Sequence, residues 1–146
     1  PPPRPQPSVP TRRSSDLFCR QSGVVPYRLR KGKLEVFLIT SRSNKRWIIP
    51  KGIIERNYSA RNSAAKEALE EAGIRGRVAG KLLGVYQNRK WGKTCTVKVF
   101  PMQVSRVYKE WDEDDRKRQW VPLKKALKLV ENDDLKRVMR KLPECI

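Results

Sequence analysis

The stretch "PKGIIERNYSARNSAAKEALEEAGI" (residues 50–74) decides the fold that we predict for this chain. A loop containing Gly52 leads into a segment in which small apolar residues recur at the helical spacing i, i+3, i+4 and i+7: Ala65, Ala68, Leu69 and Ala72. Ser59 is a suitable N-cap and Gly73 a suitable C-terminal stop, so the sequence predicts a helix over residues 59–72. Because its apolar stripe is narrow and its residues are small, we expect this helix to pack closely on a sheet.

Glutamates occupy another face of the predicted helix. Glu67, Glu70 and Glu71 are separated by three and four positions, and residues at these spacings are neighbours on an α-helix. The three carboxylates are therefore expected to reach one point. An acidic helix face is more often simply solvated, and like-charge neighbours cost only about 0.2–0.5 kcal/mol per pair. The helix taken alone does not establish a function.

The spacing across the whole stretch resembles the signature of the Nudix hydrolase family, G-x5-E-x7-R-E-U-x-E-E-x-G-U, in which U is a bulky aliphatic residue. The residues that match it without a gap are Gly52, Glu67, Glu70, Glu71, Gly73 and Ile74, and the lead-in "WIIPKG" (residues 47–52) is also similar. Three positions depart from the signature. Tyr58 stands in place of its first Glu, Lys66 replaces its Arg, and Ala68 is smaller than the usual aliphatic residue. These changes leave the rate and the number of metal ions open.

This resemblance implies an α/β fold, a Nudix-type α/β/α sandwich with a central mixed β-sheet. It also implies a hydrolase that cleaves a diphosphate linked to another group with Mg²⁺ or Mn²⁺. The implied metal ligands are Glu67, Glu70, Glu71 and the backbone carbonyl of Lys51. Glu67 would be a ligand or the base that orients water, and Lys66 would brace it. The acidic stretch 110–115 could add a further ligand, for which we select Glu113.

Basic residues are predicted to hold the substrate phosphates, since phosphate oxygens accept charge-assisted hydrogen bonds. Three segments are similar to the diphosphoinositol-polyphosphate and dinucleoside-polyphosphate branch of the family: "ITSRSNKRWIIPKG", "GRVAGKLLGVYQNR" and "EWDEDDRKRQWVPLKKA". Solvation at the surface is the ordinary alternative for each basic residue. The predicted substrate-binding residues are Arg20, Arg28, Arg42, Arg46, Lys51, Gly52, Arg116 and Arg118.

The composition limits the partners and the chemistry. The chain of 146 residues has a formal net charge of +19, which favours polyanionic partners. It has no histidine, which excludes His-dependent triads and His-ligated zinc. The favoured partner is a polyphosphorylated small molecule. The alternative is a basic RNA-binding or RNA-end-processing protein of the same fold with weak or no metabolite hydrolysis, although no recognised RNA-reading motif is present. The oligomeric state is left open.

Residues 1–17 are predicted to be disordered or an artefact of sequence assembly, because they are rich in Pro and Ser and "PTRRSSDL" looks like a translated sequencing adapter. Residues 18–146 are predicted to form a single domain. We expect three reduced thiols, no membrane span and a cytoplasmic location. The predicted strands are 23–29, 34–41, 46–50, 77–89, 93–107 and 119–123, and further helices are predicted over about 124–130 and 133–141.

Overall fold

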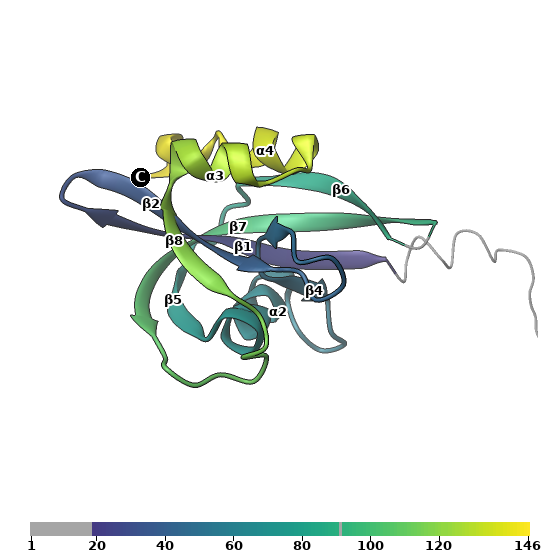
Figure 1. The fold of residues 1–146 in the computed structure, drawn as a ribbon. Helices are drawn as coiled ribbons and strands as arrows, with labels where there is room; N and C mark the ends of the chain where they lie inside the picture. The colour runs from purple at the N-terminus through teal and green to yellow at the C-terminus, as the bar shows by residue number, and fades with distance from the viewer. Residues whose placement is uncertain (1–18, 91) are drawn as a thin grey trace, which may run out of the picture.

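The computed structural model describes residues 19–90 and 92–146 (Figure 1). The predicted segment 1–17 and Phe18 lie outside the described residues. The strands are β1 (Arg20–Arg30), β2 (Lys33–Thr40), β3 (Trp47–Ile48), β4 (Lys51–Ile53), β5 (Ile74–Val78), β6 (Gly84–Lys90), β7 (Lys93–Val107) and β8 (Arg118–Pro122). The helical elements are α2 (Ala60–Glu67), the π-helical turn η1 (Ala68–Ala72), α3 (Leu123–Leu129), α4 (Asp133–Met139) and the 3-10 turn η2 (Leu142–Cys145).

The strands form one mixed sheet with the order β3-β2-β1-β7-β5. Strands β4, β6 and β8 also pair with β1, β7 and β2, respectively. The central strands β1 and β7 run parallel, and the other pairs are antiparallel. The predicted mixed sheet is confirmed.

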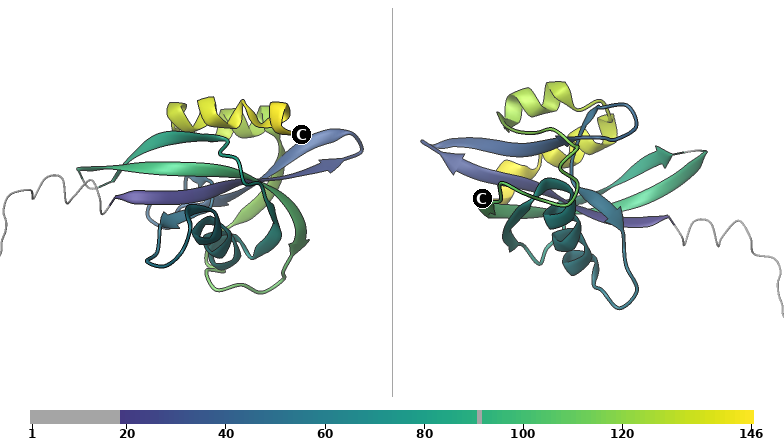
Figure 2. Two further views of the ribbon diagram at one scale, coloured as in Figure 1. Left: turned by 180° about the vertical axis from the view of Figure 1, so that it is seen from behind. Right: turned by 60° about the horizontal axis from the view of Figure 1, so that its bottom comes forward.

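Helices cover both faces of this sheet (Figures 1 and 2). Successive residues of a strand point to opposite faces, so Val24 of β1 packs towards α2 and Val25 packs towards α3 and α4. The α2 side is closed by the small residues Ala64, Ala68 and Ala72, all fully buried. The predicted α/β/α sandwich is therefore confirmed. The predicted apolar stripe is confirmed for Ala68 and Ala72, whereas Ala65 and Leu69 are only partly buried and Ala64, which was not predicted, is buried instead.

The predicted helix 59–72 differs from the structure in one respect. The Ser59 side chain accepts a hydrogen bond from the Asn62 amide, as expected for an N-cap, and Gly73 ends the helix with φ of 66°. The last five residues, however, form the π-helical turn η1 rather than a continuation of the α-helix.

Two predicted strands differ in the structure. The predicted strand 46–50 is shortened to β3, and a strand that was not predicted, β4, begins after Pro50, which has no amide hydrogen to donate to a ladder. The predicted strand 77–89 becomes β5 and β6, because each pairs with a different part of the long strand β7. Among the described residues, no helix is long and apolar enough to cross a membrane.

The prediction of three reduced thiols is wrong for two cysteines. Cys19 and Cys95 form a disulfide, although 76 positions separate them, and Cys145 is free. The parallel register places Arg20 opposite Thr96, so the residue before each of them is brought to the same end of β1 and β7. Sequence spacing gave no indication of this pairing, because it depends on the strand register.

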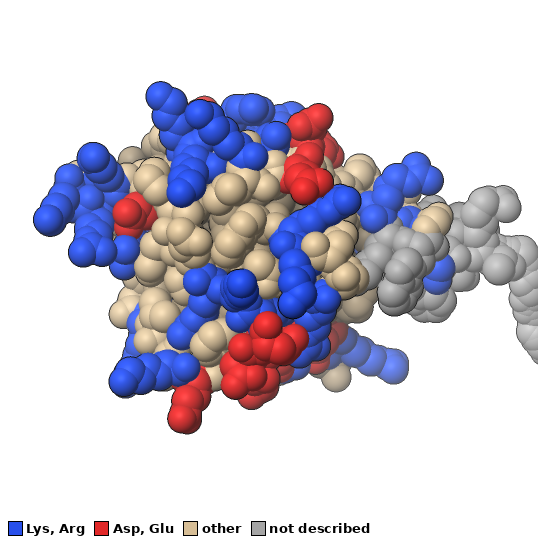
Figure 3. Space-filling model, viewed as in Figure 1, with Lys and Arg blue, Asp and Glu red and all other residues tan. Residues whose placement is uncertain are grey.

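Basic side chains dominate the surface. Figure 3 shows Lys and Arg spread over the face seen in Figure 1, with acidic side chains confined to a few groups. This distribution is the structural expression of the net charge of +19.

Candidate active site

Glu71 is fixed where the π-helical turn meets β4. Its side chain is largely buried, and its Oε1 accepts a hydrogen bond from the Lys51 amide at 3.1 Å. Its backbone carbonyl accepts a hydrogen bond from Nε1 of Trp111 at 3.1 Å. Strand β4 therefore holds the carboxylate of Glu71, and the loop that carries Trp111 holds its backbone.

Glu67 lies beside Glu71 and against the backbone of Gly52. A Cβ atom added to Gly52 would lie 2.6 and 2.7 Å from the two carboxylate oxygens of Glu67, closer than real Cβ contacts allow. The carboxyl groups of Glu67 and Glu71 are also hydrogen-bonded to each other. A glycine at position 52 thus makes room for a pair of adjacent acids.

The surroundings of this pair disfavour two negative charges. Burial raises the pKa of Glu71 to about 7, although Arg116 and the Lys51 amide oppose the shift. Burial, followed by the charge of Glu70, also raises the pKa of Glu67. A pair of neighbouring carboxylates with raised pKa values is a place where a cation would be stabilised.

Glu70 does not join this pair, which corrects the expectation that all three carboxylates reach one point. A π-turn contains more residues per turn than the 3.6 of an α-helix. Glu71, four positions after Glu67, therefore lies almost one full turn further along and on the same side of the helix. Glu70, only three positions after Glu67, lies on a different side. The side chain of Glu70 is 32% exposed and lines a different hollow of the surface, together with Lys66, Tyr58 and Trp111.

Lys66 holds Glu70 in this position. Its Nζ lies 3.1 Å from Oε2 of Glu70 and 2.6 Å from Oε2 of Glu55, and these two partners raise its pKa. The predicted bracing of Glu67 by Lys66 is therefore limited to its charge, which lowers the pKa of Glu67, while the ion pairs of Lys66 are made with Glu55 and Glu70. Glu55 was missed by the sequence analysis, because no periodic pattern links a loop residue to a helix residue eleven positions later. Tyr58 contributes its ring, which lies 5.8 Å from Nζ of Lys66.

A cleft of about 980 Å³ opens beside Glu71. It is lined from the 41–48 loop, β4, β6 and the segment joining α3 to α4. Of the predicted substrate-binding residues, the structure brings five to this cleft: Arg42, Arg46, Lys51, Gly52 and Arg116. It also brings Glu113, the predicted additional ligand.

Acidic partners surround the arginines of the cleft. Arg116 lies 2.9 Å from Glu113 and 3.7 Å from Glu71, with its side chain only 10% exposed. Arg42 is paired with Asp115 at 2.9 Å. Across the mouth of the cleft, Arg46 is paired with Glu131 at 3.2 Å. These arginines are directed towards the cleft but have to exchange partners when an anion binds.

Three predicted substrate-binding residues lie away from the cleft lining. Arg28 donates to Glu35 at 2.7 Å and lies over the ring of Trp120. Arg118 donates to the carbonyl of Ala72 at 2.8 Å and lies 3.6 Å from the ring of Trp111. Arg20 is exposed at the start of β1. Arg118 thus supports the backbone behind the acidic pair, a role that sequence reasoning could not separate from phosphate binding.

The cleft also contains neutral groups that the sequence analysis did not select. Gln21, Gln87, Asn88 and Asn132 line its part nearest β1 and β6. The Oε1 atom of Gln21 is buried without a hydrogen-bond partner. These amides give the cleft a polar, uncharged part next to its arginines.

The acidic pair fits a hard divalent cation. Such ions prefer oxygen ligands, and Glu67 and Glu71 supply carboxylate oxygens in a buried position where ionisation is otherwise disfavoured. Within residues 19–90 and 92–146, however, no group of three or more Asp, Glu, His or Cys side chains is gathered closely enough to hold an ion. The existing carboxylate pair therefore needs further oxygen donors.

An α/β/α sandwich with a buried acidic pair next to an arginine-lined cleft defines a protein that handles phosphorylated ligands. Comparison with known proteins identifies its family: the model of the NUDIX domain matches residues 19–142. The chain therefore belongs to the Nudix hydrolase family.

Several relatives support this assignment. Over 149 residues the chain is 30% identical to "Nudix hydrolase 12, mitochondrial" of Arabidopsis thaliana, with 87% of this chain and 73% of that protein covered. Over 101 residues it is 35% identical to "Diphosphoinositol polyphosphate phosphohydrolase 3-alpha" of Mus musculus, with 66% and 60% covered. The chain thus spans about six tenths of the length of the mouse relative.

Solved structures show the same fold. A structure of the C. elegans Ap4A hydrolase superposes with a TM-score of 0.73 at 22% identity, covering 87% of this chain and 97% of that one. At this level of identity the likeness concerns the fold.

Proposed function

We propose that this chain is a divalent-cation-dependent pyrophosphohydrolase. Its substrate would be a heavily phosphorylated small molecule that contains a diphosphate linkage, of the diphosphoinositol-polyphosphate or dinucleoside-polyphosphate type. The observation that carries this proposal is the pair of half-buried Glu67 and buried Glu71, with Glu71 at the edge of a cleft lined by Arg42, Arg46 and Arg116. The names of the relatives in mouse and nematode support the substrate class.

Glu67 and Glu71 would hold the cation, with the backbone carbonyl of Lys51 as a further oxygen donor. Glu113 also lines the cleft and would contribute a third carboxylate. Glu70 would become a ligand of the cation only after its ion pair with Lys66 is broken. Bound Mg²⁺ or Mn²⁺ would neutralise the diphosphate and make a water molecule more acidic.

The remaining steps belong to the side chains of this chain. Arg42 and Arg46 would bind phosphate oxygens after releasing Asp115 and Glu131, which are exposed partners held by weak surface ion pairs. Arg116 would stay on Glu71 and keep that carboxylate ionised, since its charge lowers the pKa of Glu71. A carboxylate oxygen of Glu67 would accept the proton of the attacking water.

A substrate panel with and without Mg²⁺ tests the proposal. The panel contains a diphosphoinositol polyphosphate, a dinucleoside tetraphosphate and ADP-ribose, and phosphate release is compared for the wild type, Glu67→Gln, Glu71→Gln and the exposed control Glu144→Gln. We expect the first two substrates to exceed ADP-ribose. We also expect Glu67→Gln and Glu71→Gln to lower kcat/KM at least about a hundredfold, which is the usual effect of removing a general base.

Binding of Mn²⁺, measured by electron paramagnetic resonance, separates cation binding from turnover. Glu71→Gln should weaken Mn²⁺ binding, whereas Glu144→Gln should not. Full activity in both acidic-pair variants would refute the mechanism, and preference for ADP-ribose would refute the substrate class.

A further inference from the structure

One end of the molecule carries basic side chains that form no ion pair with any other residue that the structure describes. We call it the basic end. It comprises the tip of the β1–β2 hairpin, the outer face of α3 and the chain after α4. Its basic residues, all exposed, are Arg30, Lys31, Lys33, Lys124, Lys125, Lys128, Arg140 and Lys141, and the chain after α4 also contains one exposed acid, Glu144.

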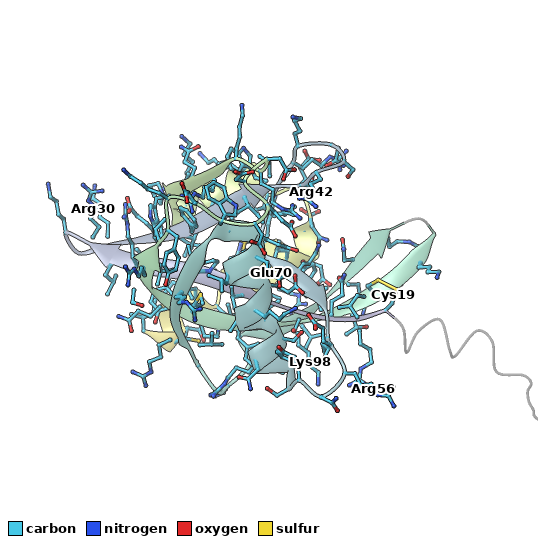
Figure 4. The ribbon with its side chains drawn as sticks, turned by 90° about the horizontal axis from the view of Figure 1, so that it is seen from below. Cys19, Arg30, Arg42, Arg56, Glu70 and Lys98 are labelled. Atoms are coloured by element: carbon cyan, nitrogen blue, oxygen red, sulfur yellow. A yellow bond between two sulfur atoms is a disulfide. The ribbon has the colours of Figure 1, made fainter. Side chains whose placement is uncertain are left out.

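These segments lie together in space. Glu35 of β2 pairs with Pro122, the residue just before α3, so the hairpin and the start of α3 are adjacent. Figures 1 and 2 place the C-terminal end of the chain beside the same hairpin, and Figure 3 shows basic side chains over both. Figure 4 labels Arg30 at the outer end of the β1–β2 hairpin, well apart from Arg42, which lies nearer the middle of that view. The basic end is therefore separate from the candidate active site.

The cations of the basic end differ from those of the cleft. Arg42, Arg46 and Arg116 each have a carboxylate within 3.2 Å. Among the described residues, no member of the basic end forms an ion pair. The nearest acid along the hairpin, Glu35, is already bonded to Arg28.

Helix stability accounts for Lys128, a cation in the last turn of α3, but not for Lys124 and Lys125 in its first turn. The first turn of a helix is stabilised by acidic residues, yet α3 has none there. Its apolar residues Leu123, Ala126 and Leu127 pack into the core, so the lysines only cover the outer face. Unpaired like charges repel one another, and a bound polyanion would relieve this repulsion.

We infer that the basic end binds the phosphate backbone of single-stranded RNA without sequence preference. Binding to a phosphate backbone requires little more than an array of cations. A membrane-surface helix would need an exposed apolar face, often with aromatic residues. Here the apolar face of α3 is buried in the core, and the exposed large apolar residues at this end, Leu29 and Ile146, are not aromatic. The surface chemistry therefore fits RNA better than a lipid bilayer.

The test measures the binding of a fluorescent, unstructured RNA of about 20 nucleotides by anisotropy over a range of salt concentrations. The wild type should bind with an affinity that falls steeply with salt, since each neutralised phosphate contributes about −0.7 to the slope of log K against log salt. The variant K31E/K33E/K124E/K125E should bind at least tenfold more weakly. Its slope should be shallower by about 3, because four contacts are removed.

A matched variant controls for net charge. R61E/R77E/R106E/K109E changes the charge by the same amount at exposed positions on α2, β5, β7 and the following loop. It should bind RNA within about threefold of the wild type. Equal loss in both variants would mean that only the net charge matters, and the inference would be wrong.

Two further measurements close the alternatives. Binding to phosphatidylserine vesicles in the absence of RNA binding would overturn the inference in favour of a membrane. Circular dichroism checks that each variant is folded. If the charge-reversal variant K31E/K33E/K124E/K125E is not folded, K31Q/K33Q/K124Q/K125Q takes its place. Diphosphate hydrolysis by the reversal variant should match the wild type, so failure of this inference would leave the proposed function untouched.

Discussion

Replacing Glu71 by Gln should remove a pH dependence of stability that the wild type shows in the absence of divalent cations. The folded-state pKa of Glu71, about 7, lies above its ordinary value of 4.5, so the folded protein binds this proton more tightly than the unfolded chain. The stabilisation is fully present below pH 4.5 and is lost as the pH rises through 7. At about 1.4 kcal/mol per pH unit, the difference between 4.5 and about 7 corresponds to at most about 3.5 kcal/mol.

Guanidinium denaturation in EDTA at several pH values between about 5 and 8 measures this effect. The free energy of unfolding of the wild type should fall with pH relative to that of Glu71→Gln, because the amide does not titrate. The exposed control Glu144→Gln should follow the wild type. Added Mg²⁺ should flatten the wild-type profile, since a cation stabilises the ionised pair. Parallel profiles for wild type and Glu71→Gln in EDTA would refute the assignment of Glu71 as a buried acid of raised pKa.

Three other predictions concern the site and the cysteines. Gly52→Ala should lower kcat at least tenfold and weaken Mn²⁺ binding measured by electron paramagnetic resonance, because the added methyl group would displace Glu67; unchanged kinetics would contradict this. Arg46→Ala should raise KM about tenfold in steady-state assays, because the loss of one charge-assisted hydrogen bond to the substrate weakens binding by about that factor. Its free energy of unfolding should stay within about 0.5 kcal/mol, because its pair with Glu131 is exposed; a large loss of stability would assign it a structural role. A thiol assay on the folded, unreduced protein should titrate Cys145 alone, and titration of all three cysteines would refute the disulfide.

The parts of the fold that were predicted correctly depend on local sequence. Ser59 caps the helix through its own side chain, and Gly73 ends it through a backbone conformation that favours glycine. The approach of Glu67 to Gly52 follows from the same short stretch, because strand β4, the loop and the helix are consecutive. Information contained within about twenty residues was therefore enough for this part of the site.

The parts that were missed depend on tertiary neighbours. The sequence predicts Arg28 and Arg118 as phosphate ligands, but each lies on a tryptophan whose position only the folded chain defines. The Cys19–Cys95 disulfide requires the parallel register of β1 and β7. Glu55, the partner of Lys66, belongs to a loop without periodicity. No sequence pattern distinguishes these residues from solvated ones.

The π-helical turn is less favourable than a regular α-helix, but the geometry of the acidic pair depends on it. Deleting one residue between Ala68 and Ala72 would allow regular i→i+4 hydrogen bonds, which are the more common and better-supported arrangement. The same deletion would rotate Glu71 away from the Lys51 amide and take its carboxylate out of reach of Glu67. A variant selected for heat resistance through this segment is therefore expected to lose turnover, so engineering for durability should leave these five positions unaltered.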